Sequence, residues 1–233
     1  MSLVLSIDTS TKNCSVSVSK DSVLLYTIEE LSESFTHAEK LHVFCEKIVK
    51  KLNISFAQID AYAFSAGPGS YTGLRIGAAA IKGFAFCFNK PVVLLSTLKC
   101  LANFFKKEDG LICSLIDSRV GEVYMSLYDF EMNNLVKPHS HIITKSSLKN
   151  YLSKNKIYFV GTGLNKMQNI LCHKNAEEIK NIFPSSKYMI EEVHKKIKKK
   201  KICRYFKFRT YVLKRFCCYT TKEKFDIVNF SIL

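Results

Sequence analysis

Apolar residues fall into short runs along the first thirty positions of the chain. The runs at 4–7, 14–18 and 23–28 are β-branched or alternate with polar residues, and short polar turns separate them. Alternation with a period of two places successive side chains on opposite faces of a sheet. The pattern therefore predicts a three-stranded meander at the start of the chain.

The following segment changes to a helical period. Apolar residues recur three or four positions apart from 38 to 52, and Thr36 precedes Glu39 by three positions, as in a capping box. We therefore expect a helix over 37–52 that begins at the Thr36 hydroxyl. Its apolar stripe comprises Ala38, Leu41, Cys45, Ile48 and Leu52, with Val43, Phe44 and Val49 spreading beside it.

A glycine-rich stretch at 65–83, SAGPGSYTGLRIGAAAIKG, organises the first half. An apolar run at 61–64 predicts a strand before it, and the GPGS sequence at 67–70 predicts a sharp turn. We expect a second helix after the turn, capped by Thr72. Interior glycine lowers helix stability by ~1 kcal/mol, so a glycine face predicts close approach by another backbone. That face consists of Gly73, Gly77 and Ala80.

The second half repeats the opening pattern. A strand at 91–95 and a helix at 98–106 end the first half, and strands are then predicted at 111–116 and 122–128. An Ile-Asp-hydroxyl turn leaves the first strand of each half, at 7–9 and at 116–118. The repeat is too weak to establish a duplication by itself.

Composition indicates a folded intracellular protein with a basic end. The chain has 233 residues, is 47% hydrophobic and carries a net charge of +15. Residues 195–233 hold 13 Lys and Arg against two acids. An odd count of nine scattered cysteines predicts reduced thiols, and we find neither a signal peptide nor a membrane-spanning run. We therefore expect a cytoplasmic protein.

Several motifs in one order resemble the TsaB family, also called YeaZ. They are GPGSYTGLRIG at 67–77, IDTST at 7–11, CSV at 14–16, STL at 96–98, IDSR at 116–119, GEVY at 121–124 and VGTG at 160–163. That family is the dimerisation subunit of the machinery that makes threonylcarbamoyladenosine at position 37 of tRNA. The resemblance runs from about residue 3 to 189.

The resemblance implies an α/β fold of the actin-like, Hsp70 and sugar-kinase (ASKHA) superfamily. Each of two lobes is expected to have a mixed β-sheet with flanking helices, the first at 1–106 and a smaller one at 107–190. Residues 191–233 do not match the family. They are either an out-of-frame translation or a basic, aromatic arm that binds RNA, and we expect residues after about 192 to be dispensable for folding.

The sequence contains few residues in patterns typical of catalytic, nucleotide-binding or metal sites. In the superfamily, Asp-hydroxyl turns approach nucleotide phosphates, which makes Asp8, Thr9, Ser10 and Asp117 the candidate nucleotide contacts; ordinary turn chemistry explains the same residues. The glycine loop fails the Walker, dinucleotide and nucleophile-elbow patterns. His37 and His42 lie five positions apart, roughly 140° around a helix, so they do not share a metal. We expect no catalytic residue and no metal site.

These observations favour a partner role. Both predicted helices have more apolar surface than one sheet covers, and in TsaB-like proteins the corresponding helices form a four-helix bundle with the catalytic paralogue TsaD, or with a second copy in its absence. We expect Gly77→Leu to fold but to lose this partner. The predicted interface consists of Leu41, Phe44, Cys45, Ile48, Gly73, Ile76, Gly77 and Ala80.

The resemblance further implies the ATPase TsaE as a partner and indirect contact with tRNA through the complex. We expect no membrane association and no cofactor of its own, while the interface of the complex is a place where ATP or ADP could bind. Two alternatives stay open. One is an ATP-dependent phosphotransferase of the same fold. The other is an RNA-binding module that acts through the basic tail.

Overall fold

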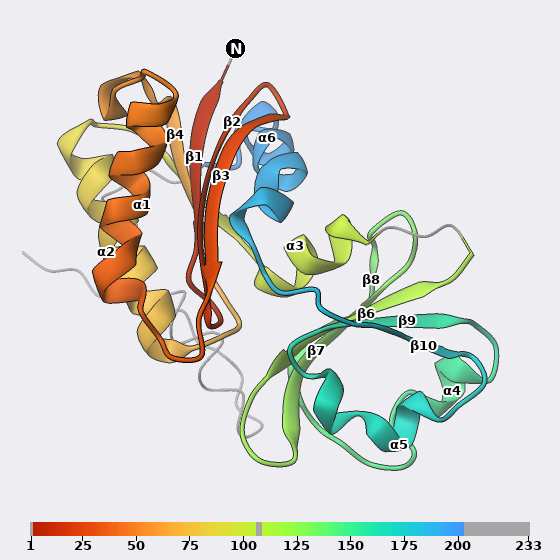
Figure 1. Cartoon of the computed structure of the whole chain (residues 1–233). Coiled ribbons are helices and arrows are strands. Elements are labelled where there is room, and N and C mark those ends of the chain that lie inside the picture. Colours follow the sequence, from red (N-terminus) through yellow and green to blue (C-terminus); the bar gives the residue numbers. More distant parts are fainter. Residues whose placement is uncertain (1, 106–108, 203–233) are drawn as a thin grey trace, which may run out of the picture.

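Two five-stranded mixed sheets form two lobes of the chain (Figure 1). The computed structural model describes residues 2–105 and 109–202. The first sheet has the order β3-β2-β1-β4-β5. Its strands are β1 (Leu3–Asp8), β2 (Asn13–Lys20), β3 (Val23–Leu31), β4 (Ala61–Ser65) and β5 (Val92–Leu95).

The second sheet repeats this topology. Its order is β10-β9-β6-β7-β8, with the same pattern of antiparallel and parallel neighbours as the first. The Ile-Asp turns leave β1 and β6, the central strands of the two sheets. The repeat seen in the sequence is therefore a repeat of the fold. Its strands are β6 (Leu111–Asp117), β7 (Glu122–Tyr128), β8 (Asn134–Ile142), β9 (Ile157–Gly161) and β10 (Ala176–Ile179).

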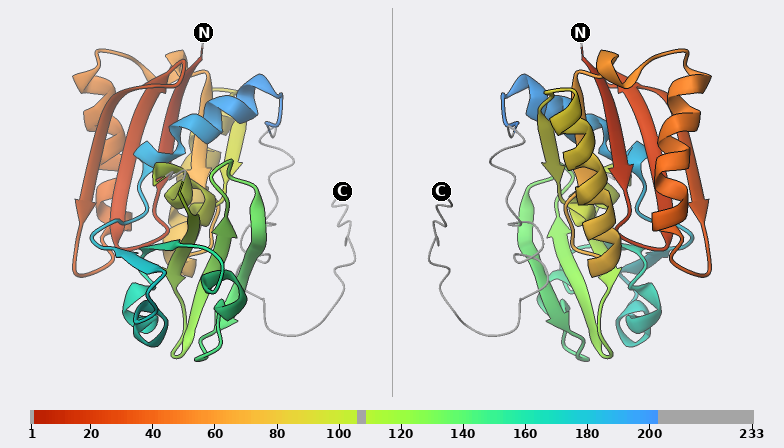
Figure 2. Two further views of the ribbon diagram at one scale, coloured as in Figure 1. Left: turned by 90° about the vertical axis from the view of Figure 1, so that its right-hand side faces the viewer. Right: turned by 90° about the vertical axis from the view of Figure 1, so that its left-hand side faces the viewer.

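Helices cover both faces of the first sheet. The α1 helix (His37–Lys51) and the α2 helix (Tyr71–Cys87) pack on one face, where Leu5 and Ile7 of β1 contribute to the core. Val4 points to the other face and joins a second core that contains Met189 and Val193. Alternation along β1 thus supplies both layers. Figure 2 shows the first sheet and the helices around it from two opposite sides.

Shorter helices complete the second lobe. The α3 helix (Thr97–Phe104) packs on the second sheet through Leu98 and Leu101. The opposite face is covered by α4 (Lys149–Leu152), α5 (Gln168–Leu171) and the 3₁₀ turn Leu164–Lys166. Two further 3₁₀ turns lie at Phe56–Gln58 and Ser186–Met189. In the described ranges, no helix is long and apolar enough to span a membrane.

Both helix caps expected in the first lobe need correction. The Thr36 side chain makes no capping hydrogen bond to α1 and instead lies 3.3 Å from the Ser32 hydroxyl. The α2 helix begins two residues earlier than expected, because Ser70 caps it by accepting a hydrogen bond from the Gly73 N–H at 3.2 Å. Cap geometry depends on the backbone entering the helix, which the sequence pattern does not specify.

The second lobe ends before 190, because the chain returns to the first lobe there. The turn Ser186–Met189 contacts β1, β2 and β4, and α6 (Ile190–Lys198) contacts β5. Val193 is fully buried. The ring of His194 is hydrogen-bonded to Ser2 Oγ at 3.1 Å and to Ser19 Oγ at 3.0 Å. The start of the basic tail is therefore a core helix of the first lobe, contrary to our expectation; residues 203–233 lie outside the described part.

We now expect residues 193–202 to be necessary for full stability. A chain that ends at Glu192 should lose about 3 kcal/mol of unfolding free energy relative to a chain that ends at Ile202, because the burial of Val193 and the His194 hydrogen bonds are lost. Urea unfolding of the two truncated chains measures this difference. Equal urea midpoints and equal slopes for the two chains would show that α6 is dispensable for folding.

Candidate functional site

The turn after β1 lies beneath the glycine loop. Ser70 N–H donates to the Ser10 carbonyl at 2.7 Å, and Thr9 Oγ1 donates to the Gly73 carbonyl at 2.8 Å. Asp8, Thr9 and Ser10 are each only 1% exposed. The three candidate nucleotide contacts of the first lobe are therefore covered by the protein's own loop and are not open to a nucleotide in this conformation.

Burial makes Asp8 an unusual carboxyl group. Its Oδ1 accepts hydrogen bonds from Ser10 N at 2.9 Å and Ser10 Oγ at 2.6 Å, while Oδ2 has no hydrogen-bond partner among the described residues. Burial disfavours the charged form and raises the pKa of Asp8 to about 6, although the Ser10 hydrogen bonds act in the opposite direction. Asp8 is therefore a buried structural acid within a covered turn.

Asp117 occupies the equivalent turn of the second lobe but is exposed. It forms an ion pair with Lys166, whose Nζ also donates to the Ser118 carbonyl at 3.2 Å and the Arg119 carbonyl at 2.7 Å. Neither of the two cavities described below is lined by Asp8, Thr9, Ser10 or Asp117. The two Asp turns thus differ in accessibility and share neither cavity.

Most side chains expected at the partner interface belong to the protein's own core. Leu41, Cys45 and Ile48 are fully inaccessible, and Phe44 is 7% exposed. On α2, Gly73, Gly77 and Ala80 are buried and Ile76 is partly buried. The prediction is corrected for the buried positions, because the apolar stripe of each helix packs on the first sheet. Ile76 and Ala80 still border the groove described next.

The glycines of α2 serve an internal contact. A Cβ atom built on Gly73 would lie 2.1 Å from the Thr9 carbonyl oxygen, and one on Gly77 would lie 2.4 Å from Thr9 Oγ1. The close approach expected for this face is real, but the neighbour is the turn after β1 of the same chain. Gly77→Leu is consequently expected to unfold the protein rather than to detach a partner.

An apolar groove does run along the outer side of the two helices. Its volume is about 500 Å³, and small residues form much of its floor. The sequence pattern included Ala38, Ile76 and Ala80 among its apolar helix positions. It did not show that these residues line one groove together with Ala79 and Gly83. The groove is open to solvent and suits close approach by another helix. Its lining comprises Ala38, His42, Ile76, Ala79, Ala80, Gly83, Phe84 and Cys87.

Histidines hold turns in place. His37 Nε2 donates to the Thr11 carbonyl at 2.7 Å, and burial lowers the His37 pKa. His141 Nε2 lies 2.7 Å from Ser147 Oγ, a pairing that sequence reasoning did not foresee. The Ser147 hydroxyl is buried and accepts from Thr144 N–H at 2.9 Å, so it closes a turn and is not placed as a nucleophile. Across 2–105 and 109–202, no three His, Cys, Asp or Glu side chains group as metal ligands.

Comparison with known proteins decides the family. Residues 32–208 match the family model described as TsaD, tRNA N6-adenosine threonylcarbamoyltransferase. A protein of Buchnera aphidicola subsp. Schizaphis graminum, named tRNA threonylcarbamoyladenosine biosynthesis protein TsaB, is 30% identical over 213 residues, or 88% of this chain and 99% of that protein. The chain belongs to the TsaB family. The matched region includes α6, which we had placed outside the family.

Other TsaB relatives match less of their length. The TsaB protein of Haemophilus influenzae is 36% identical over 130 residues, which cover 53% of this chain and 52% of that protein. The chain thus spans about half the length of this relative. The structure of YeaZ from Pseudomonas aeruginosa superimposes with a TM-score of 0.76 at 23% identity and covers 88% of this chain and 97% of that one. The TsaB fold is therefore present, and it is actin-like.

Two glycines of α2 allow a matched test of the internal contact. Gly77→Ala should destabilise the protein by ~1–3 kcal/mol, because the new methyl overlaps Thr9. Gly83→Ala should raise stability by ~0.5–1 kcal/mol, because its Cβ meets no atom within 4 Å and alanine favours a helix. Thermal unfolding of both variants measures the difference. Equal effects would mean that Thr9 does not restrict this helix.

Asp8 predicts an unusual dependence of stability on pH. The pKa of about 6 in the folded chain lies above the ordinary value of 3.8, so the folded chain keeps the Asp8 proton to higher pH than the unfolded chain does. Stability therefore falls as pH rises from about 4 to about 6. The full shift corresponds to about 3 kcal/mol. Urea unfolding between about pH 4 and about pH 6 should show that the stability of Asp8→Asn does not fall as that of the unaltered chain does. A constant difference between the two proteins at all pH values would contradict the prediction.

Proposed function

We propose that this chain is the non-catalytic dimerisation and activating subunit of the complex that makes N6-threonylcarbamoyladenosine at position 37 of tRNA. The observation that carries the proposal is the 30% identity to the Buchnera TsaB protein over 99% of its length. The proposed place of action is the cytoplasm.

The geometry of the Asp turns supports a role without catalysis. A transferase of this superfamily needs an open cleft in which both Asp turns reach a nucleotide. Here the first turn is covered by the glycine loop, and Asp117 is paired with Lys166. We propose that the chain itself transfers no group and needs no cofactor of its own, and that ATP or ADP binds where the subunits of the complex meet. No observation favours a phosphotransferase.

The groove between α1 and α2 is the proposed docking site for the catalytic TsaD-family paralogue. Its floor is formed by small side chains, so a partner helix can approach closely and exclude water from Ile76 and Phe84. Two helices from each protein would form a four-helix bundle. In the absence of the paralogue, a second copy of the chain occupies the same face. TsaE and tRNA join through the assembled complex.

Ala79→Arg tests this docking site. The residue is exposed on the groove floor, so a charged, bulky side chain should leave the fold intact and weaken binding of the purified TsaD-family paralogue from the same cell at least about tenfold. Calorimetric titration measures the affinity. Threonylcarbamoyladenosine in tRNA from cells that contain only this variant should fall in parallel.

Ala57→Arg is the matched control, since Ala57 is equally exposed but lies outside the groove. It should bind the paralogue as the unaltered chain does. Full binding by Ala79→Arg would move the interface to another face. Unchanged tRNA modification in cells that lack the chain altogether would refute the proposed function itself.

A further inference from the structure

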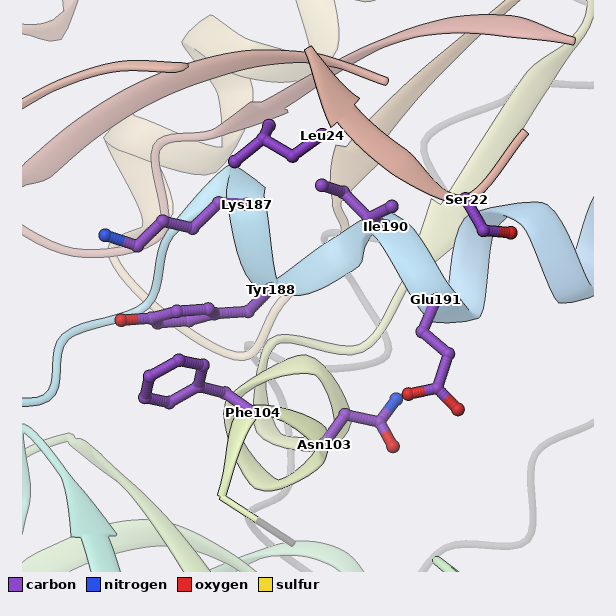
Figure 3. Close-up of a pocket in the computed structure, with 8 residues that line it drawn as sticks. All are labelled: Ser22, Leu24, Asn103, Phe104, Lys187, Tyr188, Ile190 and Glu191. Carbon is purple, nitrogen blue, oxygen red and sulfur yellow. The ribbon is translucent and has the colours of Figure 1, made fainter. Parts of the chain in front are cut away.

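A second hollow lies on the opposite side of the first sheet from the helix groove. It has a volume of about 440 Å³ and opens between the β2–β3 hairpin, the end of α3 and the start of α6 (Figure 3). The sequence pattern does not indicate this pocket, because its walls come from three segments that are distant in the chain. Its lining includes Leu24, Asn103, Phe104, Tyr188, Ile190 and Glu191.

Asn103 is the unexplained group in this pocket. The residue is 8% exposed, and neither its amide nitrogen nor its amide oxygen has a hydrogen-bond partner among the described residues. A buried, unpaired amide is unfavourable, so native structures supply it with a partner. The amide offers a donor beside an acceptor, which a ligand with an adjacent acceptor and donor would satisfy.

The surroundings of Asn103 suit a flat ligand. Phe104 is 48% exposed and stacks on Tyr188 with ring centroids 3.9 Å apart, while Leu24 and Ile190 add apolar walls. Glu191 lies beside Asn103 in Figure 3, but its side chain is 45% exposed and is tethered to Lys195 at the surface. Rotation of Glu191 towards solvent would uncover the amide without moving the backbone.

The helix that forms one wall of the pocket leads into a basic segment. The helix α6 and the residues after it carry six lysines between 195 and 201, and those from Lys198 onward are exposed. Of the nearby acids, Glu192 is paired with Lys99 and Glu29 with Lys187. A lysine run that leads away from an aromatic pocket is suited to phosphates that follow a base.

We propose that this pocket binds an adenine base, with the phosphates attached to it lying along the lysines of α6. Adenine presents its amino group next to a ring nitrogen acceptor, the pattern that an asparagine amide reads with two hydrogen bonds. Its face would stack on the exposed ring of Phe104. The base comes either from a free adenine nucleotide or from single-stranded RNA. This binding site goes beyond the proposed function and does not depend on it.

The test uses the full chain and fluorescein-labelled oligoadenylate and oligouridylate of equal length, followed by anisotropy. Oligoadenylate should bind the tighter of the two, by about tenfold. Asn103→Leu, which keeps the volume but removes the amide, should abolish this preference and leave oligouridylate binding unchanged. Replacing Lys198 and Lys199 by Gln should weaken both RNAs equally and reduce the salt dependence. The control is Asn150→Leu, an exposed asparagine of the second lobe, which should change nothing.

Competition by AMP identifies the source of the base. If AMP displaces oligoadenylate when the two are at equal concentration, the pocket binds a free nucleotide. If AMP binds about a hundredfold more weakly than oligoadenylate, the pocket binds RNA, because phosphate contacts then supply most of the affinity. Equal binding of the two RNAs by the unaltered chain overturns the proposal. So does an intact preference in Asn103→Leu.

If circular dichroism shows that Asn103→Leu does not fold, Phe104→Ala decides, because this half-exposed ring is replaceable without loss of the core. It should weaken oligoadenylate binding, and unchanged binding refutes the site. Binding of the TsaD-family paralogue is measured separately, so failure here leaves the proposed function untouched.

Discussion

The contact between helix α2 and the turn after β1 fixes much of the first lobe. Gly73 and Gly77 leave room for Thr9, and the Thr9 hydroxyl donates to the Gly73 carbonyl. The glycine loop is held against Ser10 by a second backbone hydrogen bond. A side chain at either helix position would push α2 away from the sheet. The helix therefore has one orientation, and its outer face, not its glycine face, borders the apolar groove.

The same contact makes the Asp turns of the two halves differ in exposure. Both sheets have the same strand order, and both central strands end in an Asp turn. In the first half the loop covers the turn and excludes water from Asp8, whose pKa rises. In the second half the turn stays open and Lys166 neutralises Asp117. The two halves thus share one topology, and the turn of the first half is used for packing.

The return of the chain to the first lobe creates the other surface features. The helix α6 covers the second face of the first sheet, and the turn before it brings Tyr188 against Phe104 of α3. The pocket around Asn103 exists only because these segments meet. The apolar groove and this pocket lie on opposite faces of the sheet, as the positions of α1, α2 and α6 in Figure 1 make plain. One lobe therefore carries both hollows.

The sequence by itself determined the α/β class, the meander, the first two helices within two residues, the turn at 67–70 and the family. Period, β-branching and glycine act locally, so these features are visible along the chain. Only the tertiary structure decided which apolar residues face the protein's own sheet and which face solvent. Periodicity marks a stripe such as Leu41 and Ile48 but does not say what covers it. The basic composition after 190 hid Val193 and His194, whose burial depends on strands roughly 100 to 190 positions earlier. Asn103 looked ordinary for the same reason, because burial and hydrogen-bond partners are properties of contacts between segments that are distant in sequence.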